Sequence, residues 1–270
     1  MSENMGTEIA KELAKSVYDD AGKAITKPTG ELVGLVPRTV KAALAPLEKW
    51  ILKQEYSVAE TRKLLEKKLE NIPPEQIEEP EPHIAIPAMQ YISYCMDNEE
   101  LREMYANLLA NSMIKVMKNG VHPGFVEIIK QLCPDEARIL RYMYKKRTIP
   151  TISLRWEDTN GSGIYKTKYF TNVGEFARCE SPYTTAKYFD NLMRLGLVSS
   201  SGGLSSLANK QVYEPLKNHA WLKPYILPEE QLKLQGYERV KFEEGFMRIT
   251  DYGLSFCDIC LGVTGIIEES

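Results

Sequence analysis

The central stretch of the chain, residues 86–140, decides the fold, and it reads IPAMQYISYCMDNEELREMYANLLANSMIKVMKNGVHPGFVEIIKQLCPDEARIL. Leu101, Tyr105 and Leu108 repeat at three- and four-residue spacing, which places them on one face of an α-helix. Lys118-Asn119-Gly120 then provides a cationic last turn followed by glycine, a common way for a helix to end. The stretch therefore predicts a series of packed helices, and it contains no recognised catalytic motif.

The carboxylates of this stretch allow two interpretations. Asp97 followed by Glu100 has the spacing of a capping box at a helix start. Asp97 and Glu100 also belong to a group with Glu99 and Glu103 that offers oxygen ligands to a hard cation. We favour capping, because acids at a helix N-terminus interact favourably with the helix dipole and need no metal. No metal site is predicted, and His122, without a second ligand at helical spacing, is given no catalytic role.

Upstream of the central stretch the chain is helical and interrupted. Residues 1–72 are expected to form helices over 7–26, 32–52 and 57–71, and the last of these begins with a Ser57/Glu60 capping box. Residues 73–87 combine five prolines with four glutamates, a composition that predicts an extended linker. Residues 88–133 then form the central helical block.

A second interpretation of residues 30–70 concerns membranes. Residues 32–52 are apolar and rich in Ala and Gly, and the following helix carries a basic face, so the pair resembles an element that lies in a bilayer interface. Glu60, Glu66 and Glu70 alternate with the lysines, which favours an ordinary solvated helix surface instead. Contact with a membrane is kept as an alternative.

The C-terminal half, residues 134–270, has the pattern of a winged-helix-like domain. A helix over 134–147 and a strand over 148–154 precede a short helix at 171–177. Ser181-Pro182 then begins a longer helix, 182–195, which ends at Gly196 before another strand. A hairpin is predicted over 239–249, turning at Glu243-Glu244-Gly245, and a last helix follows from Asp251. The predicted fold class is therefore α+β, mainly α, with an N-terminal helical block followed by this domain.

Helix 182–195 and the hairpin are the candidate contact surfaces for nucleic acid or a partner. The candidate residues are Thr184, Thr185, Lys187, Asn191, Arg194, Arg239 and Lys241. Their charge is a thin footprint for a phosphate backbone, since DNA-binding domains commonly carry a clear basic stripe. We favour contact with a protein partner or self-association, and DNA binding stays as the alternative because a few well-placed side chains can suffice.

Specific strings in the chain also point to a family. Residues 32–51 (LVGLVPRTVKAALAPLEKWI), 86–113 and 122–140 together resemble the abortive infection alpha (Abi-alpha) family of bacteria and prophages. The resemblance extends over residues 20–200 and implies a bacterial protein associated with phage defence. It implies no catalytic residue.

Composition limits the remaining classes of function. Net charge is −3 over 270 residues, and neither half has the basic excess of a generic nucleic-acid-binding surface. Five cysteines form an odd, sparse set, which indicates reduced thiols in the cytoplasm. Cys257 and Cys260 form a CxxC without a second ligand pair, so we interpret them as small apolar residues of the last helix rather than as half of a zinc site. No signal-peptide core and no uncharged membrane span is seen.

These observations predict an intracellular bacterial phage-defence protein that acts by binding or sensing and is not an enzyme. No cofactor is predicted. A winged-helix transcriptional regulator and a membrane-perturbing effector are the alternatives.

Overall fold

The computed structural model describes residues 55–262. The helices predicted for residues 7–26 and 32–52 lie outside this range. The described chain is α+β and mainly helical, which confirms the predicted class. It divides into two compact units: residues 132–257 form one, and residues 55–131 together with 258–262 form the other. No helix in the described range is long and apolar enough to span a bilayer.

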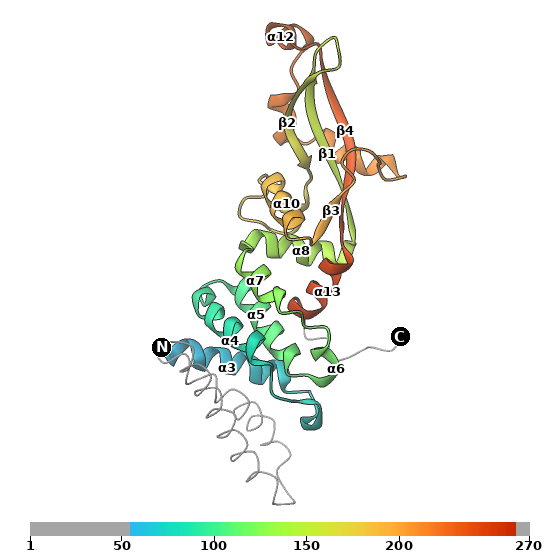
Figure 1. The fold of residues 1–270 in the computed structure, drawn as a ribbon. Coiled ribbons are helices and arrows are strands. Elements are labelled where there is room, and N and C mark those ends of the chain that lie inside the picture. Colours follow the sequence, from blue (N-terminus) through green and yellow to red (C-terminus); the bar gives the residue numbers. More distant parts are fainter. Residues whose placement is uncertain (1–54, 263–270) are drawn as a thin grey trace, which may run out of the picture. The chain divides into compact units, whose positions relative to one another are not determined.

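The first unit is a group of helices arranged around α5 (Glu99–Ser112) (Figure 1). Residues 104–112 of α5 are all buried, because neighbouring helices cover every side of it. These neighbours are α3 (Glu55–Leu69), α4 (Pro82–Ile92) and α7 (Gly124–Lys130). The short helices η1 (Pro74–Gln76), η2 (Ser93–Cys95) and α6 (Lys115–Lys118) lie between them in the chain.

Helix boundaries in this unit differ from the predicted ones. The N-cap of α5 is Asn98, not Asp97: the Asn98 side chain accepts the Leu101 N–H at 3.0 Å. Ser57 lies within α3 rather than ahead of it. Helix α4 begins at Pro82, so the segment expected to be extended becomes helical from that residue. Proline is well tolerated in the first turn of a helix, where its missing N–H would have no intrahelical partner.

Two buried asparagines connect α5 to the end of the chain. Asn107 donates to the Cys260 carbonyl at 3.0 Å, and Asn111 donates to the carbonyls of Ile259 at 2.8 Å and Gly262 at 3.0 Å. The last carbonyls of a helix have no intrahelical donor. The two amides therefore satisfy the C-terminal end of α13 (Asp251–Cys260).

The second unit is built on a four-stranded antiparallel sheet in the order β2-β1-β4-β3. Its strands are β1 (Thr148–Glu157), β2 (Gly163–Phe170), β3 (Val198–Ser200) and β4 (Arg239–Ile249). Helix α8 (Pro134–Lys146) precedes β1, and the short α9 (Val173–Phe176) and α10 (Thr185–Arg194) lie between β2 and β3 in the chain (Figure 1).

The hairpin predicted over 239–249 is wrong. These residues form the single strand β4, which pairs with β1 from Arg239↔Glu157 to Arg248↔Thr148 without a break. The sequence pattern was misleading because Gly245 does not make a turn. A Cβ atom there would come within 2.8 Å of Ser201 Oγ, so the absence of a side chain at Gly245 lets the Ser201 hydroxyl lie close to β4.

One face of the sheet carries the core. Ile152, Leu154, Trp156 and Phe170 pack there against Tyr213, Leu216, Leu222 and Leu232. The last four belong to a covering segment, residues 204–238, between β3 and β4. Its short helices are η3 (Lys210–Tyr213), α11 (Glu214–Lys217), η4 (Ala220–Tyr225) and α12 (Glu229–Leu234).

Candidate functional site

The opposite face of the sheet, called the polar face below, carries hydrophilic side chains. In β1 the alternation of a strand places Thr151, Ser153, Arg155 and Glu157 there. Cross-strand pairing adds Glu243 opposite Ser153, and Lys241 and Tyr165 on either side of Arg155. The two faces of one sheet are therefore chemically opposite, and the polar one is the candidate for ligand contact.

An irregularity in β2 shapes this face. The register between β1 and β2 shifts on both sides of Leu154, so β2 has extra residues relative to its partner. Tyr169 has φ of 53°, in the left-handed region that bulky residues rarely adopt. Its N–H donates to Ser153 Oγ at 3.3 Å. Bulges redirect side chains, and strained backbone is found disproportionately at functional sites.

A glycine turn forms the opposite wall. Gly202 and Gly203 have φ of 61° and 73°, and the Leu204 N–H donates to the Ser201 carbonyl at 3.1 Å, as in a turn of type I′. Ser201 Oγ accepts the Phe246 N–H at 3.0 Å, which holds the turn against β4. The missing side chain of Gly245 makes this approach sterically feasible.

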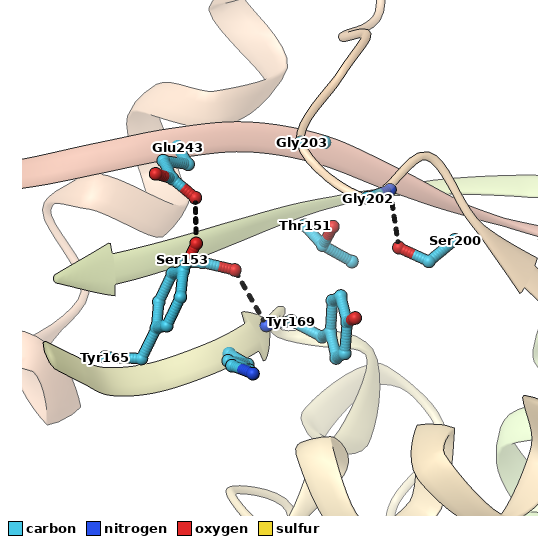
Figure 2. A pocket seen from close by; sticks show the side chains of 10 residues that line it. Thr151, Ser153, Tyr165, Tyr169, Ser200, Gly202, Gly203 and Glu243 are labelled. Atoms are coloured by element: carbon cyan, nitrogen blue, oxygen red, sulfur yellow. Dashed lines mark hydrogen bonds between the residues drawn. The ribbon is translucent and has the colours of Figure 1, made fainter.

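Between these walls lies a polar cavity of about 80 Å³ (Figure 2). Its lining residues are Thr151, Ser153, Tyr165, Lys168, Tyr169, Ser200, Gly202, Gly203, Glu243 and Gly245. Hydroxyl groups dominate this set, and one cation and one carboxylate accompany them.

The carboxylate of the cavity is held by two neighbours. Glu243 accepts the Tyr165 hydroxyl at 2.7 Å, drawn in Figure 2, and the Arg155 guanidinium at 3.4 Å. The hydrogen bond to Glu243 raises the pKa of Tyr165 above its ordinary value, so this phenol stays protonated and acts as a donor near neutral pH. Lys168 Nζ lies 4.9 Å from the centroid of the Tyr165 ring.

Comparison with known proteins gives the cavity a family context. The family model described as abortive infection alpha matches residues 53–260, which include the whole sheet and its cavity. The chain belongs to the abortive infection alpha family. Membership suggests a role in abortive infection, a form of phage defence.

Other comparisons add little to this assignment. No curated protein matches this Abi-alpha chain. A solved structure of an uncharacterised protein from the marine bacterium Alcanivorax borkumensis SK2 is similar, with 16% sequence identity and a TM-score of 0.36. That match covers 54% of this chain and 94% of the other.

The candidate residues at the start of α10 are unequally accessible in this Abi-alpha protein. Thr184 and Lys187 are exposed, and Thr184 is the N-cap of the helix. Thr185 is only 1% exposed, so the expectation that it faces solvent is wrong. Thr185 is buried because it lies on the same face of α10 as Tyr188, Phe189 and Leu192, and this face packs into the protein.

Asn191 and Arg194 are linked to each other. Asn191 donates to both carboxylate oxygens of Glu136 at 3.0 Å and accepts hydrogen bonds from Arg194 at 3.1 and 2.6 Å. Asn191 therefore connects α10 to the first turn of α8. Arg194 is exposed at the end of α10.

Arg239 and Lys241 form a different cluster. Both bind Glu157, Arg239 at 2.8 Å and Lys241 at 2.9 Å, and the Glu157 side chain is only 2% exposed. The Lys241 hydrogen bond is the main cause that lowers the pKa of Glu157. The cluster lies at the start of β4, whereas α10 contacts β3, which pairs with Met247–Ile249 at the end of β4. At about 3.3 Å per residue, these positions are roughly 25 Å apart along the strand, so the two candidate surfaces are not one site.

Sequence reasoning missed the cavity residues. Strand β2 was not predicted, although residues 163–170 read GIYKTKYF and are rich in β-forming aromatic residues. The Ser201-Gly202-Gly203 string was a detectable turn signal. The bulge at Tyr169 and the position of Glu243 beside Tyr165 depend on strands far apart in the chain and had no local signal.

Two other sequence hypotheses concerned metals and thiols. Among residues 55–262 no group of three His, Cys, Asp or Glu side chains is placed to hold a metal ion. Glu103 instead pairs with Lys68 at 2.6 Å. Cys257 and Cys260 are fully buried on α13 and are not in disulfide bonds.

Proposed function

We propose that this Abi-alpha protein is a cytoplasmic phage-defence protein that senses a ligand through the polar cavity of residues 132–257 and is not an enzyme. The observation that carries the proposal is the preformed cavity inside the region shared with the family. A site whose groups are already fixed loses little conformational entropy when a ligand binds. The bonds Tyr165–Glu243 and Tyr169–Ser153 provide this fixation.

The chemistry of the cavity favours binding over catalysis. The Glu243 carboxylate is occupied by Tyr165 and Arg155, which makes it a weak general base. Tyr165 keeps its proton because its pKa is raised. Glu243 and Tyr165 are therefore poorly suited to proton transfer, and they help to hold the shape of the cavity.

We further propose that residues 134–270 are winged-helix-like and contact a protein partner or a second copy of the chain. The order β1-β4-β3, with α8, α9 and α10 ahead of β3 in the chain, supports this architecture. In such a domain α10 is the recognition helix, and its exposed Lys187 and Arg194 make DNA the second candidate ligand. The nearby exposed Asp190 and the engagement of Arg194 with Asn191 support protein contact over DNA.

The test is protection of bacteria from phage. Cells with the gene and cells with an empty vector are compared across a broad phage panel, by plaque counts and by survival of infected cells at high multiplicity. We expect fewer plaques together with early death or arrest of infected cells. Tyr165→Phe, which removes one cavity bond, should weaken protection at an unchanged protein level. Equal plaque counts for all phages would refute the proposal.

The alternatives have separate tests. A salt-dependent mobility shift of duplex DNA that is lost in a Lys187→Ala/Arg194→Ala variant would favour the regulator. Leakage of liposomes would favour the membrane effector, whose proposed segment, residues 30–70, is described here only from residue 55.

A further inference from the structure

The cavity is lined by one cation, Lys168, and one carboxylate, Glu243. Glu243 is compensated by Arg155, which lies 3.4 Å from it. Lys168 lines the same cavity, and within residues 55–262 no carboxylate lies within ion-pair distance of its ammonium group. Arg155 is shared between Glu243 and Glu157, which lies 3.6 Å from it, whereas Lys168 contributes a positive charge to the lining. A ligand of negative charge would therefore be attracted to this point.

The hydroxyl groups of the cavity are poised to donate hydrogen bonds. Ser153 Oγ already accepts the Tyr169 N–H at 3.3 Å, and Ser200 Oγ accepts the Gly202 N–H at 3.0 Å. Figure 2 draws both bonds. A hydroxyl group has one proton to donate besides its acceptor sites. Because backbone N–H groups occupy the acceptor side, the protons of Ser153 and Ser200 are available to an acceptor in the cavity.

The strained residue contributes to this arrangement. The left-handed conformation of Tyr169 directs its N–H to Ser153, and the bulge brings Lys168 to the cavity wall. The neighbouring Lys166 lies on the other side, with its Nζ 3.7 Å from the centroid of the Trp156 ring in the covered core face. Two lysines two residues apart thus serve different surfaces.

The volume limits what can enter. The cavity of about 80 Å³ is small and partly open to solvent, so a small polyatomic group can enter it while the rest of a ligand stays outside. The donors come from three strands, with Ser153 on β1, Lys168 on β2 and Ser200 at the end of β3, so a group with several acceptor oxygens can engage more than one of them. Tyr165, 42% exposed, leaves an aromatic surface beside the cavity for the rest of a ligand.

We propose that the cavity binds the phosphoryl group of a phosphorylated compound, with Lys168 as the charge partner and Ser153 and Ser200 as hydrogen-bond donors. This inference rests on the proposed sensing role of the cavity and names the class of ligand. The same chemistry is offered by a free phosphate monoester, such as a nucleotide, and by the phosphate of a nucleic-acid strand.

Isothermal titration calorimetry on the full chain tests the inference. The probes are inorganic phosphate, adenosine monophosphate, and one single-stranded oligonucleotide with and without a 5′-phosphate, at constant ionic strength set with sodium chloride. We expect phosphate-bearing probes to bind the wild type. Lys168→Ala should weaken binding by about 10- to 100-fold, the value of one charge-assisted hydrogen bond. Lys166→Ala is the matched control and should bind as the wild type does.

The outcomes separate the ligand sources and the two proposals. Binding of adenosine monophosphate but of neither oligonucleotide supports a small phosphate monoester. A 5′-phosphate dependence supports a strand end. Absence of binding by every phosphorylated probe, or equal losses in Lys166→Ala and Lys168→Ala with both variants folded by circular dichroism, overturns the inference. Phage protection without phosphate binding refutes only this inference, and phosphate binding without protection refutes only the proposed function.

Discussion

Asp135 allows the most quantitative prediction, because its carboxylate organises the segment that leads into α10. It is 5% exposed. Oδ1 accepts the Glu180 N–H and the Arg138 guanidinium, both at 2.8 Å. Oδ2 accepts the Ser181 N–H at 2.9 Å and the Tyr188 hydroxyl at 2.8 Å. One side chain therefore fixes the first turn of α8 to the start of the 180–188 segment.

Asp135→Asn keeps the shape of this side chain and replaces one acceptor oxygen by an NH₂ group. The new NH₂ group is itself a donor, and it faces the two donors that the replaced oxygen accepted from. Two hydrogen bonds to the carboxylate are therefore lost. Each such bond contributes about 1.5–3 kcal/mol, which gives a predicted destabilisation of roughly 3–6 kcal/mol. Total stabilities of domains are about 5–15 kcal/mol, so the variant should be severely weakened.

Urea denaturation followed by tryptophan fluorescence measures this loss. Trp156 and Trp221 lie in the 132–257 unit, and a Trp50→Phe background restricts the signal to it. The control is Asp190→Asn, which makes the same chemical change at an exposed position of α10. A free energy of unfolding for Asp135→Asn within about 1 kcal/mol of the wild type would refute the assignment.

Three further predictions concern other parts of the chain. Burial opposes ionisation of Asp135, but its hydrogen bonds outweigh this effect and lower the pKa of the carboxyl group. The wild type should therefore lose stability as the pH falls below about 4. Urea midpoints measured across pH 2–6 should decline less steeply with acid for Asp135→Asn than for the wild type. Asn111→Ala should destabilise the first unit by about 1–3 kcal/mol, because it leaves the carbonyls of Ile259 and Gly262 without this donor; an unchanged thermal midpoint would contradict this. Gly245→Ala should displace the glycine turn at a cost of about 1–3 kcal/mol, since its Cβ would meet Ser201 Oγ at 2.8 Å, and a melting curve equal to that of the wild type would disprove the packing argument.

Local signals in the sequence predicted the helices of the central stretch well. Apolar spacing acts within one or two turns, so it locates α5, α7 and α8 without knowledge of the rest of the chain. The stop expected at Lys118-Asn119-Gly120 does not end α5, which stops at Ser112 and is followed by the separate short helix α6. The helix N-caps were less well predicted. Asp97 and Asn98 are both favourable N-cap residues, and α5 uses Asn98. The α+β class followed from these elements.

The candidate site was much harder to predict. Glu243-Glu244-Gly245 has the composition of a turn, but the partner strand β1 lies some 90 residues earlier and imposes a continuous ladder there. The cavity combines β1, β2, the β3 turn and β4, and such long-range pairing leaves no short-range pattern. The candidate residues of α10 were selected from a helical period, which correctly placed Thr184, Lys187 and Arg194 at the surface but not Thr185. The separation of α10 from Arg239 and Lys241 depends on the sheet and has no local signal.

The β1–β4 ladder also has a consequence for how the chain folds. The ladder pairs Thr148 with Arg248 at one end, so β4 can pair with β1 only after nearly the whole second unit has been made. Bringing such distant residues together is slow, because loop-closure entropy is lost before the contacts repay it. During synthesis, the β1–β2 pair therefore waits with one edge of β1 open, and its apolar face lacks the cover of residues 204–238. Open edges template pairing with other chains. The nascent chain therefore exposes an aggregation-prone edge until residues 239–249 have been made, and a chaperone that acts before that point should raise the yield of folded protein.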